Sequence, residues 1–407
     1  MKRHGRSKRP SAVLALAAAG ALTLAACGGS DDSTSGATSA GSSNGKAAGG
    51  PSASFLTLTG STSVDLDAAT AKVLADNKIS VAPIEPATVS TSGGSTTVSF
   101  PITEGYVGVY PTTEPSYIRG TFSHSGGLKL TAGGKSLDLT DFIVNPGTSS
   151  LTATVAGKGA AKVLDLDGTD VKVSQDGADT RLDGTIAKIS QTGATALNQF
   201  FGVSLFKAGI PLGVVHVVAN GTAGPGGAPA AEFLDLKGVS TSVDLDPATA
   251  KVLADNKVTV APVEPATVST SGGTTAVSFP ISEGYVAVHP ASEPNYIRGA
   301  FSHTGGLRFS AGGKSLTVTD FVVNPGTSTL SATVEGRSVA KILDLDGTNV
   351  KVSQDGGNTR LDGTVAKLSQ TGADALNKTF NVSLFKAGIP LGVVHVVATG
   401  TPVPAAQ

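Results

Sequence analysis

Histidine and tyrosine are the side chains of this 407-residue sequence whose types and spacing suit them to hold a metal or a metal-bearing cofactor. His124 follows Phe122 by two positions, so both side chains project from one face of an expected strand. Gly126 and Gly127 turn the chain directly afterwards, and His303 has the same surroundings. A histidine at the end of a strand beside a glycine turn either binds a ligand or makes surface hydrogen bonds.

A second set of candidates is formed by aromatic residues four positions apart. Tyr106 and Tyr110 lie in an alternating strand pattern and therefore share a face, and Tyr285 and His289 stand at the matching places later in the chain. Tyrosine and histidine both bind ferric haem. The alternative is that these rings simply cover one face of a sheet.

Other polar motifs favour structural roles. His216 and His395 lie in Val-rich strands, and we expect them to be core or half-buried histidines with their hydrogen bonds satisfied. Asp165-Leu166-Asp167-Gly168 resembles half of a calcium loop, but Leu166 interrupts the oxygen ligands and the distant bidentate Glu is missing. A strand that ends in a turn explains this motif better.

No motif of an enzyme is present. The sequence has no nucleophile elbow, His-Glu-x-x-His pattern or phosphate loop, and it has a single cysteine. Ser123 and His124 are neighbours in an expected strand and point to opposite faces, so they cannot form a nucleophile and base pair. We therefore predict a protein that is not an enzyme, with no catalytic residues and no dedicated metal site.

These residues recur at a constant distance along the chain. His303 follows His124 by 179 positions, and the same separation relates Pro325 to Pro146 and His395 to His216. The offset predicts one domain written twice without an insertion. Each copy has about 165 residues, which is long enough to bury a core of its own.

The elements that must position these residues are mainly strands. Val98, Phe100 and Ile102 alternate with polar positions, and glycine pairs mark the turns. We predict a first strand at 55–58 and 233–236, a helix begun by Asp67 or by Asp246-Pro247, a second helix at 194–198, and a last, interior strand at 213–218. Roughly ten strands and two short helices in each copy predict a mainly β sandwich or a barrel-like pair of sheets.

The N-terminus predicts export and anchoring. Five basic residues at 2–9 precede an apolar run and Leu24-Ala25-Ala26-Cys27, which resembles the lipobox of bacterial lipoproteins and makes Cys27 the expected lipidation site. An ordinary cleaved signal is the alternative. We expect an extracytoplasmic protein held at the cell membrane by its N-terminal lipid.

Charge argues against a nucleic acid partner. The first 26 residues carry five of the 30 Lys and Arg and none of the 31 Asp and Glu, so the remainder has a net charge of −6. This leaves no basic footprint for a nucleic acid.

Composition divides the chain into six segments. They are a signal peptide (1–26), a disordered Gly/Ser tether (27–52), the first β-domain (53–220), a Gly/Pro linker (221–231), the second β-domain (232–401) and a tail (402–407).

The repeated block from Gly120 to Asn145 resembles the HtaA-type domain of actinobacterial surface proteins. Gly120, Phe122, His124, Gly127 and Leu128 match its glycine, strand and His-Gly-Leu turn, and the second copy matches it from Gly299 to Leu307. The resemblance implies a secreted or anchored cell-surface protein, mostly β and often tandem, that binds haem for iron acquisition.

The match to that family is incomplete. The family opens with a Trp-containing segment that carries a Tyr ligand, whereas this sequence has no Trp and has Thr70 to Leu74 at that place. Only His124 and His303 carry over as ligands, with Tyr106, Tyr110, Tyr285 and His289 as candidates for the opposite or supporting positions. The sequence thus predicts a two-domain binding protein with haem as its candidate cofactor. The alternative is a structural or adhesive protein that contacts another component of the cell envelope.

Overall fold

The computed structural model describes residues 51–403, except for positions 57, 115, 158–159, 177–178, 225–226, 294, 337 and 356–357. All of them fall within one compact unit, Gly45–Gln407. The signal peptide, Cys27, almost all of the tether and residues 404–407 lie outside the described residues, so these predictions stay predictions. No helix in the described part of the chain is both long and apolar enough to cross a membrane.

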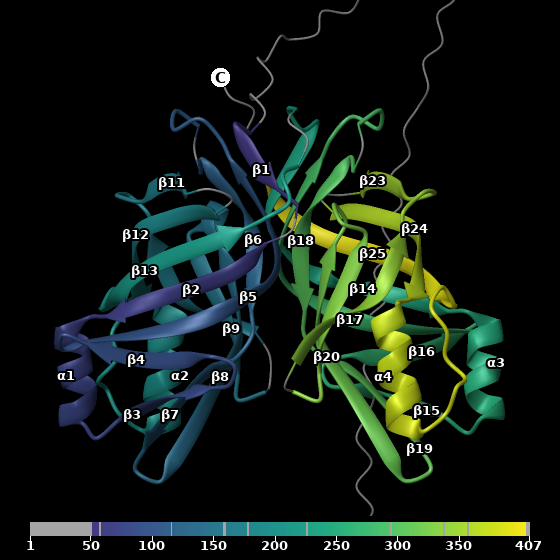
Figure 1. Cartoon of the computed structure of the whole chain (residues 1–407), viewed down its shortest axis with the longest axis horizontal. Helices are drawn as coiled ribbons and strands as arrows, with labels where there is room; N and C mark the ends of the chain where they lie inside the picture. The colour runs from purple at the N-terminus through teal and green to yellow at the C-terminus, as the bar shows by residue number, and fades with distance from the viewer. Residues whose placement is uncertain are drawn as a thin grey trace, which may run out of the picture. The chain divides into compact units, whose positions relative to one another are not determined.

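Each copy of the repeat builds its own antiparallel sheet (Figure 1). The elements of the first are β1 (Ala53–Phe55), β2 (Thr59–Leu66), α1 (Ala68–Asp76), β3 (Ser80–Ile84), β4 (Thr88–Ser92), β5 (Ser95–Val109), β6 (Ile118–His124), β7 (Gly127–Ala132), β8 (Lys135–Asn145), η1 (Pro146–Thr148), β9 (Ser150–Val155), β10 (Ala160–Asp167), β11 (Lys172–Asp176), β12 (Asp179–Ile189), α2 (Gln191–Phe201) and β13 (Pro211–Asn220).

The second copy repeats this order with one strand fewer. Its elements are β14 (Ala231–Leu245), α3 (Pro247–Asp255), β15 (Thr259–Val263), β16 (Thr267–Ser271), β17 (Thr274–Val288), β18 (Ile297–His303), β19 (Gly306–Ala311), β20 (Lys314–Asn324), β21 (Thr329–Val334), β22 (Ser338–Asp346), β23 (Lys351–Asp355), β24 (Asn358–Leu368), α4 (Gln370–Phe380) and β25 (Pro390–Pro402).

Hydrogen bonding closes each sheet into a barrel of eight strands. In the first copy the ring runs β5, β2, β13, β12, β10, β9, β8 and β6, and β6 pairs again with β5. The second ring runs β17, β14, β25, β24, β22, β21, β20 and β18. The mainly β, barrel-like prediction is confirmed. An eight-stranded barrel has an interior that side chains either fill or leave open for one small ligand.

The first helix of each copy begins where the sequence predicts. The side chain of Asp67 accepts a hydrogen bond from the Thr70 amide and caps α1, and Asp246 does the same for α3, where Pro247 takes the first helical position. The interior position predicted for the last strand is also confirmed, because β13 lies between β12 and β2.

The prediction for the second helix was too short. Helix α2 starts at Gln191 because Ser190 is its cap and accepts a hydrogen bond from the Gly193 amide. Gly193 therefore lies inside the first turn. A Cβ at this position would come within 2.4 Å of the Val163 carbonyl oxygen of β10, so glycine allows the helix to pack closely on the barrel.

The prediction of a repeat without an insertion was wrong. Phe55 and Gly60 correspond to Phe233 and Gly238 with an offset of 178, whereas the later landmarks have 179, so β14 contains one extra residue. Gly238 pairs with Ile281 and Thr241 with Phe279, so three steps along β14 match two steps along β17. The extra residue forms a bulge.

The first strand also differs from its predicted bounds. Strand β1 ends at Phe55, and the chain then pairs with the segment that follows β13, through the bridge from Phe55 to Ala223 and the hydrogen bond from the Leu56 amide to the Thr222 carbonyl. The first barrel therefore includes residues as far as Gly224, whose amide bonds to the Ser54 carbonyl. The second copy has one continuous strand, β14, at this place.

Candidate functional site

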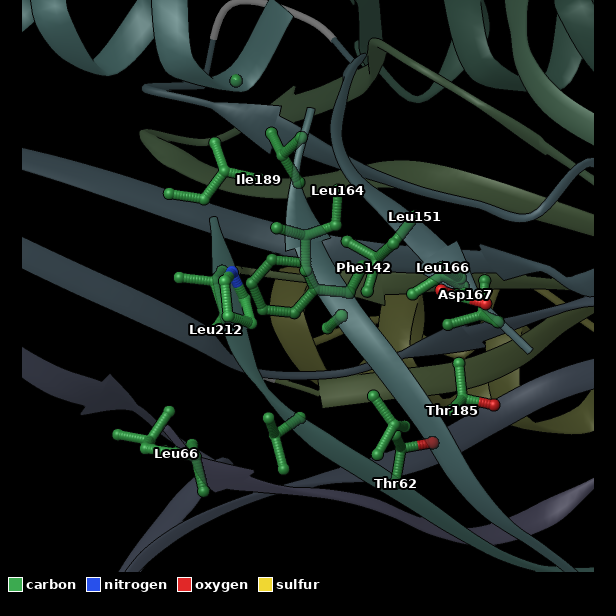
Figure 2. Close-up of a pocket in the computed structure, with 18 of the residues that line it drawn as sticks. Thr62, Leu66, Phe142, Leu151, Leu164, Leu166, Asp167, Thr185, Ile189 and Leu212 are labelled. Carbon is green, nitrogen blue, oxygen red and sulfur yellow. The ribbon is translucent and has the colours of Figure 1, made fainter. Parts of the chain in front are cut away.

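Each barrel contains a cavity lined mainly by aliphatic and aromatic side chains. The cavity of the first barrel has a volume of about 690 Å³ and that of the second about 420 Å³. Figure 2 shows Leu66, Phe142, Leu151, Leu164, Leu166, Ile189 and Leu212 around the first cavity, with Thr62, Thr185 and Asp167 on one side. Apolar cavities of about 300–1,000 Å³ with a few polar groups are typical of small-molecule sites.

The first cavity extends between two ends of different composition. At one end it is lined by Ser116, Tyr117, Asp167 and Thr169, from the turns after β5 and β10. The other end is lined by residues of α1, β3 and the segment between α2 and β13, among them Leu74, Val81, Leu205 and Ile210. Among the described lining residues, the charged side chains are Asp67 and Asp167, both acidic.

His124 lies in the wall of the first cavity, and its neutral tautomer is determined by its partners. The ring is buried, with Nδ1 3.0 Å from the Phe142 carbonyl oxygen and Nε2 2.7 Å from the Thr62 hydroxyl. A carbonyl only accepts, so Nδ1 carries the proton and Nε2 accepts from Thr62. Burial lowers the pKa of His124 to about 4, because the carbonyl only partly offsets the lost solvation of the charged ring.

His303 repeats this arrangement in the second barrel. Its Nδ1 lies 3.0 Å from the Phe321 carbonyl oxygen and its Nε2 lies 2.6 Å from the Thr241 hydroxyl. Burial lowers its pKa to about 4 as well. The predicted projection of Phe122 and His124 from one face is confirmed, since their rings lie 5.4 Å apart and both line the cavity.

The tyrosine candidates lie elsewhere, where the two copies of the repeat meet. Tyr106 and Tyr285 are fully buried and stack on each other, with ring centroids 5.5 Å apart and planes 8° from parallel. The hydroxyls of Tyr110 and Tyr285 each lie 2.5 Å from the same oxygen of Glu232. The structure therefore places these tyrosines in a contact between repeats, and neither cavity includes them in its lining.

A buried ionic cluster surrounds these tyrosines. Arg119 donates to Glu232 at 2.6 Å and lies over the ring of Tyr110, with Cζ 4.0 Å from the ring centroid. Burial raises the pKa of Tyr110, and the nearby Glu232 carboxylate raises it further. These hydroxyls are hydrogen-bond donors that remain protonated, so they are poor candidates for a metal-binding phenolate.

His289 also belongs to this contact. It replaces Tyr110 in the second copy, is buried, and lies 3.1 Å from Arg298, which in turn pairs with Glu293 at 2.7 Å. Burial lowers the pKa of His289 to about 4, and the charge of Arg298 lowers it further. Arg119 pairs with the equivalent Glu114 of its own repeat at 3.5 Å and in addition reaches Glu232 in the other repeat.

The remaining polar motifs have structural roles. His216 is half-buried between Asp65 and Asp183, and His395 lies between Asp244 and Asp362, as predicted. Asp167 ends β10, accepts from Thr169 and pairs with Lys188, so the turn interpretation is confirmed. Within the described part of the chain, no group of three or more His, Cys, Asp or Glu could hold a metal ion.

Sequence reasoning missed several residues of these two regions. Thr62 and Thr241 bond the cavity histidines from strands β2 and β14, which are distant in sequence. Glu232 was missed because the equivalent residue in the first copy is Ser54. The candidate residues stand at matching places in both copies, and this carboxylate is present in only one of them. The difference between Leu130 and Phe309 in the lining was visible in the alignment of the copies, but only the cavity gives it a meaning.

Comparison with known proteins adds a weak structural likeness. No protein-family model and no curated protein matches the chain in sequence. The crystal structure of the C-terminal domain of HtaA from Corynebacterium glutamicum aligns with a TM-score of 0.28 and 14% identity, over 42% of this chain and 99% of that one. The heme binding protein HtaB from the same organism aligns with a TM-score of 0.27 and 11% identity, over 42% of this chain and 97% of that one.

Proposed function

We propose that this chain is an extracytoplasmic, lipid-anchored binding protein in which each barrel holds one apolar small molecule in its interior. The observation that carries the proposal is the pair of apolar cavities of about 690 and 420 Å³ inside the barrels. Protein cores are normally packed with few voids larger than a water molecule. Cavities of this size therefore indicate space kept for a ligand, and removing apolar ligand surface from water supplies the binding free energy.

The lining favours a ligand without negative charge. Asp67 and Asp167 are the charged residues along the described wall of the first cavity, and a buried anion there would lack a cationic partner in the wall. Hydroxyl groups at the end formed by Ser116, Tyr117 and Thr169 suit a neutral polar head group. The geometry thus supports best a neutral, largely aliphatic molecule.

Haem is the second candidate, and the histidine arrangement is what favours it. A neutral imidazole whose Nδ1–H is held by a backbone carbonyl presents an unprotonated Nε2, as in many metal-binding histidines. His124 and His303 both meet this condition, and a bound haem would supply iron for the imidazole to coordinate in place of the Thr62 or Thr241 hydroxyl. The haem carboxylates find no Lys or Arg in the described cavity walls. The histidine nitrogen is therefore suited to coordinate the haem iron, whereas the described cavity lining offers no cation to the haem carboxylates.

Titration of the full-length mature chain distinguishes these ligands. We expect Nile red, a neutral dye that fluoresces in apolar surroundings, to bind with a stoichiometry near two per chain. Thr185 and Thr364 line the two cavities, so the double variant Thr185→Trp, Thr364→Trp should place an indole ring inside each cavity and block dye binding while the chain stays folded.

Parallel titration with ferric haem supplies the comparison. A sharpened Soret band that is lost in the same tryptophan variant assigns haem to the cavities. Dye and haem binding that both survive the variant would place the ligand elsewhere. Absence of any binding would leave the structural or adhesive role as the function.

A further inference from the structure

The two cavities differ most at one pair of equivalent positions. Leu130 in β7 and Phe309 in β19 are separated by the repeat offset of 179, and each lines its own cavity. Leu130 pairs with Val81 of the edge strand β3, and Phe309 pairs with Val260 of β15. Both residues therefore lie at the end of the barrel that carries α1 or α3.

Phe309 joins groups of side chains that are separate in the first barrel. It packs in the cluster that contains Leu316, Leu376 and Phe385, together with Leu384 and Ile389. In the first barrel the corresponding cluster around Ile79 and Phe206 includes Leu205 and Ile210 but neither Leu130 nor Leu137. A phenyl ring thus closes a gap that leucine leaves open.

The extent of the cavities follows from this difference. Val81, Leu205 and Ile210 line the first cavity, whereas their counterparts Val260, Leu384 and Ile389 do not line the second. The first cavity therefore extends farther past residue 130 than the second does past residue 309, although the second still reaches Thr249 and Leu253 of α3. This agrees with the volumes of about 690 and 420 Å³.

Other exchanges in the lining are smaller. Four more lining positions differ between the copies, and the pairs are Ser116/Asn295, Leu139/Val318, Val163/Ile342 and Ile189/Leu368. Ser116 and Asn295 belong to the opposite end. Compared with the first barrel, the second has one methylene less at Val318, in place of Leu139, and one more at Ile342, in place of Val163. Leu368 is an isomer of its counterpart, Ile189. Only Leu130/Phe309 replaces an aliphatic side chain with a ring.

We propose that the two barrels select neutral aliphatic ligands of different length, and that residue 130 or 309 sets the limit. This inference rests on the proposed function of the cavities. A chain that enters beside Tyr117 or Tyr296 extends toward the α1 or α3 end, and each buried methylene raises its affinity about fourfold. The gain should stop at a shorter chain in the second barrel, because the Phe309 ring occupies the space into which a longer ligand would extend.

The test uses the mature full-length chain and a homologous series of straight-chain fatty alcohols, with displacement of Nile red as the readout. In the parent protein, short alcohols should displace the dye from both sites and longer ones from only one. With Leu130→Phe, both barrels should accept only the shorter alcohols. With Phe309→Leu, both barrels should accept the longer alcohols as well. Val89→Phe, at an exposed position of β4, is the matched control and should change neither limit.

The outcomes separate this inference from the function on which it rests. If the alcohols bind but both barrels show one common limit, or if neither swap moves it, the assignment of residues 130 and 309 is wrong while the binding function stands. If no alcohol displaces the dye, the neutral aliphatic ligand fails and the length selection fails with it. Phe309→Leu tests the idea independently should Leu130→Phe fold poorly.

Discussion

The carboxylate of Glu232, near the start of the second repeat, lies 2.6 Å from the buried guanidinium of Arg119 in the first. The same carboxylate accepts hydrogen bonds from Tyr110 and Tyr285. Further polar contacts link the repeats, among them those from Thr121 to the Ala300 carbonyl, from Asn145 to Glu283 and from Asn324 to Glu104. The contact between repeats is therefore a polar network buried together with stacked tyrosines, and it constrains how the two barrels dock.

Loss of Glu232 should destabilise the chain strongly. Glu232→Ala removes the nearer of two carboxylates beside the buried Arg119 and leaves Glu114 at 3.5 Å, so the cost should approach the lower end of the roughly 3–5 kcal/mol for breaking a buried pair. Urea unfolding followed by circular dichroism measures this loss. Asp76→Ala, which breaks the exposed pair with Lys72, is the control and should cost less than about 1 kcal/mol. Equal effects of the two substitutions would contradict the assigned role of Glu232.

The pH dependence of stability should reveal the carboxyl groups between the repeats. Burial raises the pKa of Glu283 to about 7, and the charge of Asp235 adds to this. Burial and then the charge of Asp141 raise the pKa of Asp320 to about 7, and both aspartates line a cavity of about 260 Å³ with Glu85 and Glu264. Between the unfolded pKa values and about 7, the folded chain holds protons that the unfolded chain has released. These groups therefore contribute stability at low pH that is lost as the pH rises toward 7.

Substitution isolates this effect from the histidines. His124 and His303 act in the opposite direction, because the unfolded state takes up protons below about pH 6.5 while the folded rings stay neutral down to about pH 4. Glu283→Gln keeps an acceptor for Asn145 and cannot ionise. Its stability relative to the parent should increase from pH 5 to pH 8, as measured by urea midpoints. A difference that does not vary with pH would show that Glu283 titrates normally.

The hydroxyls of Thr62 and Thr241 should compete with haem iron for the cavity histidines. Thr62→Val with Thr241→Val removes the donor to each Nε2, so it should destabilise the chain by about 1–3 kcal/mol and yet strengthen haem binding. His124→Ala with His303→Ala should abolish it, whereas His395→Ala should leave it intact. Soret titrations measure the affinity. Unchanged haem binding in the His124, His303 variant would exclude these residues as ligands.

Cys27 should anchor the protein. Cys27→Ala removes the expected acylation site, so the variant should leave the membrane fraction for the medium or retain its signal peptide. Fractionation and labelling with palmitate measure this. Identical fractionation of the parent and the variant, with equally poor labelling, would contradict lipidation.

Each barrel should fold by itself. Because the hydrogen-bonded ring of each barrel closes within one copy, fragments 53–224 and 231–403 should unfold cooperatively, although the fragments expose the polar network and lose its contribution. The first fragment extends past the predicted boundary of 220 because Thr222 and Gly224 bond to Leu56 and Ser54. Mild proteolysis of the full chain should cut first in residues 28–52 and 225–229. Failure of both fragments to fold would indicate one interdependent unit.

Local signals in the sequence were enough for the repeat, the strand-rich class and the capped helices. Asp67 and Asp246 cap helices because the bonds that they form span three residues, and a short window of sequence contains all the partners. The alternation around Phe100 likewise needs only neighbouring residues. The one extra residue of β14 was also present in the sequence, as a change of offset from 179 to 178, but the agreement of the later landmarks concealed it.

Only the tertiary structure decided what the candidate residues do. His124 and Tyr106 both lie in predicted strands. The sequence could not show whether these strands bring the two side chains together, because a sandwich and a barrel would place them differently. Strand β6 closes the barrel by pairing with both β5 and β8, and His124 at its end lines the cavity. Tyr106 instead stacks on Tyr285, which lies 179 residues later in the sequence. Contacts of this range depend on register and docking, which many residues determine together and no local pattern records.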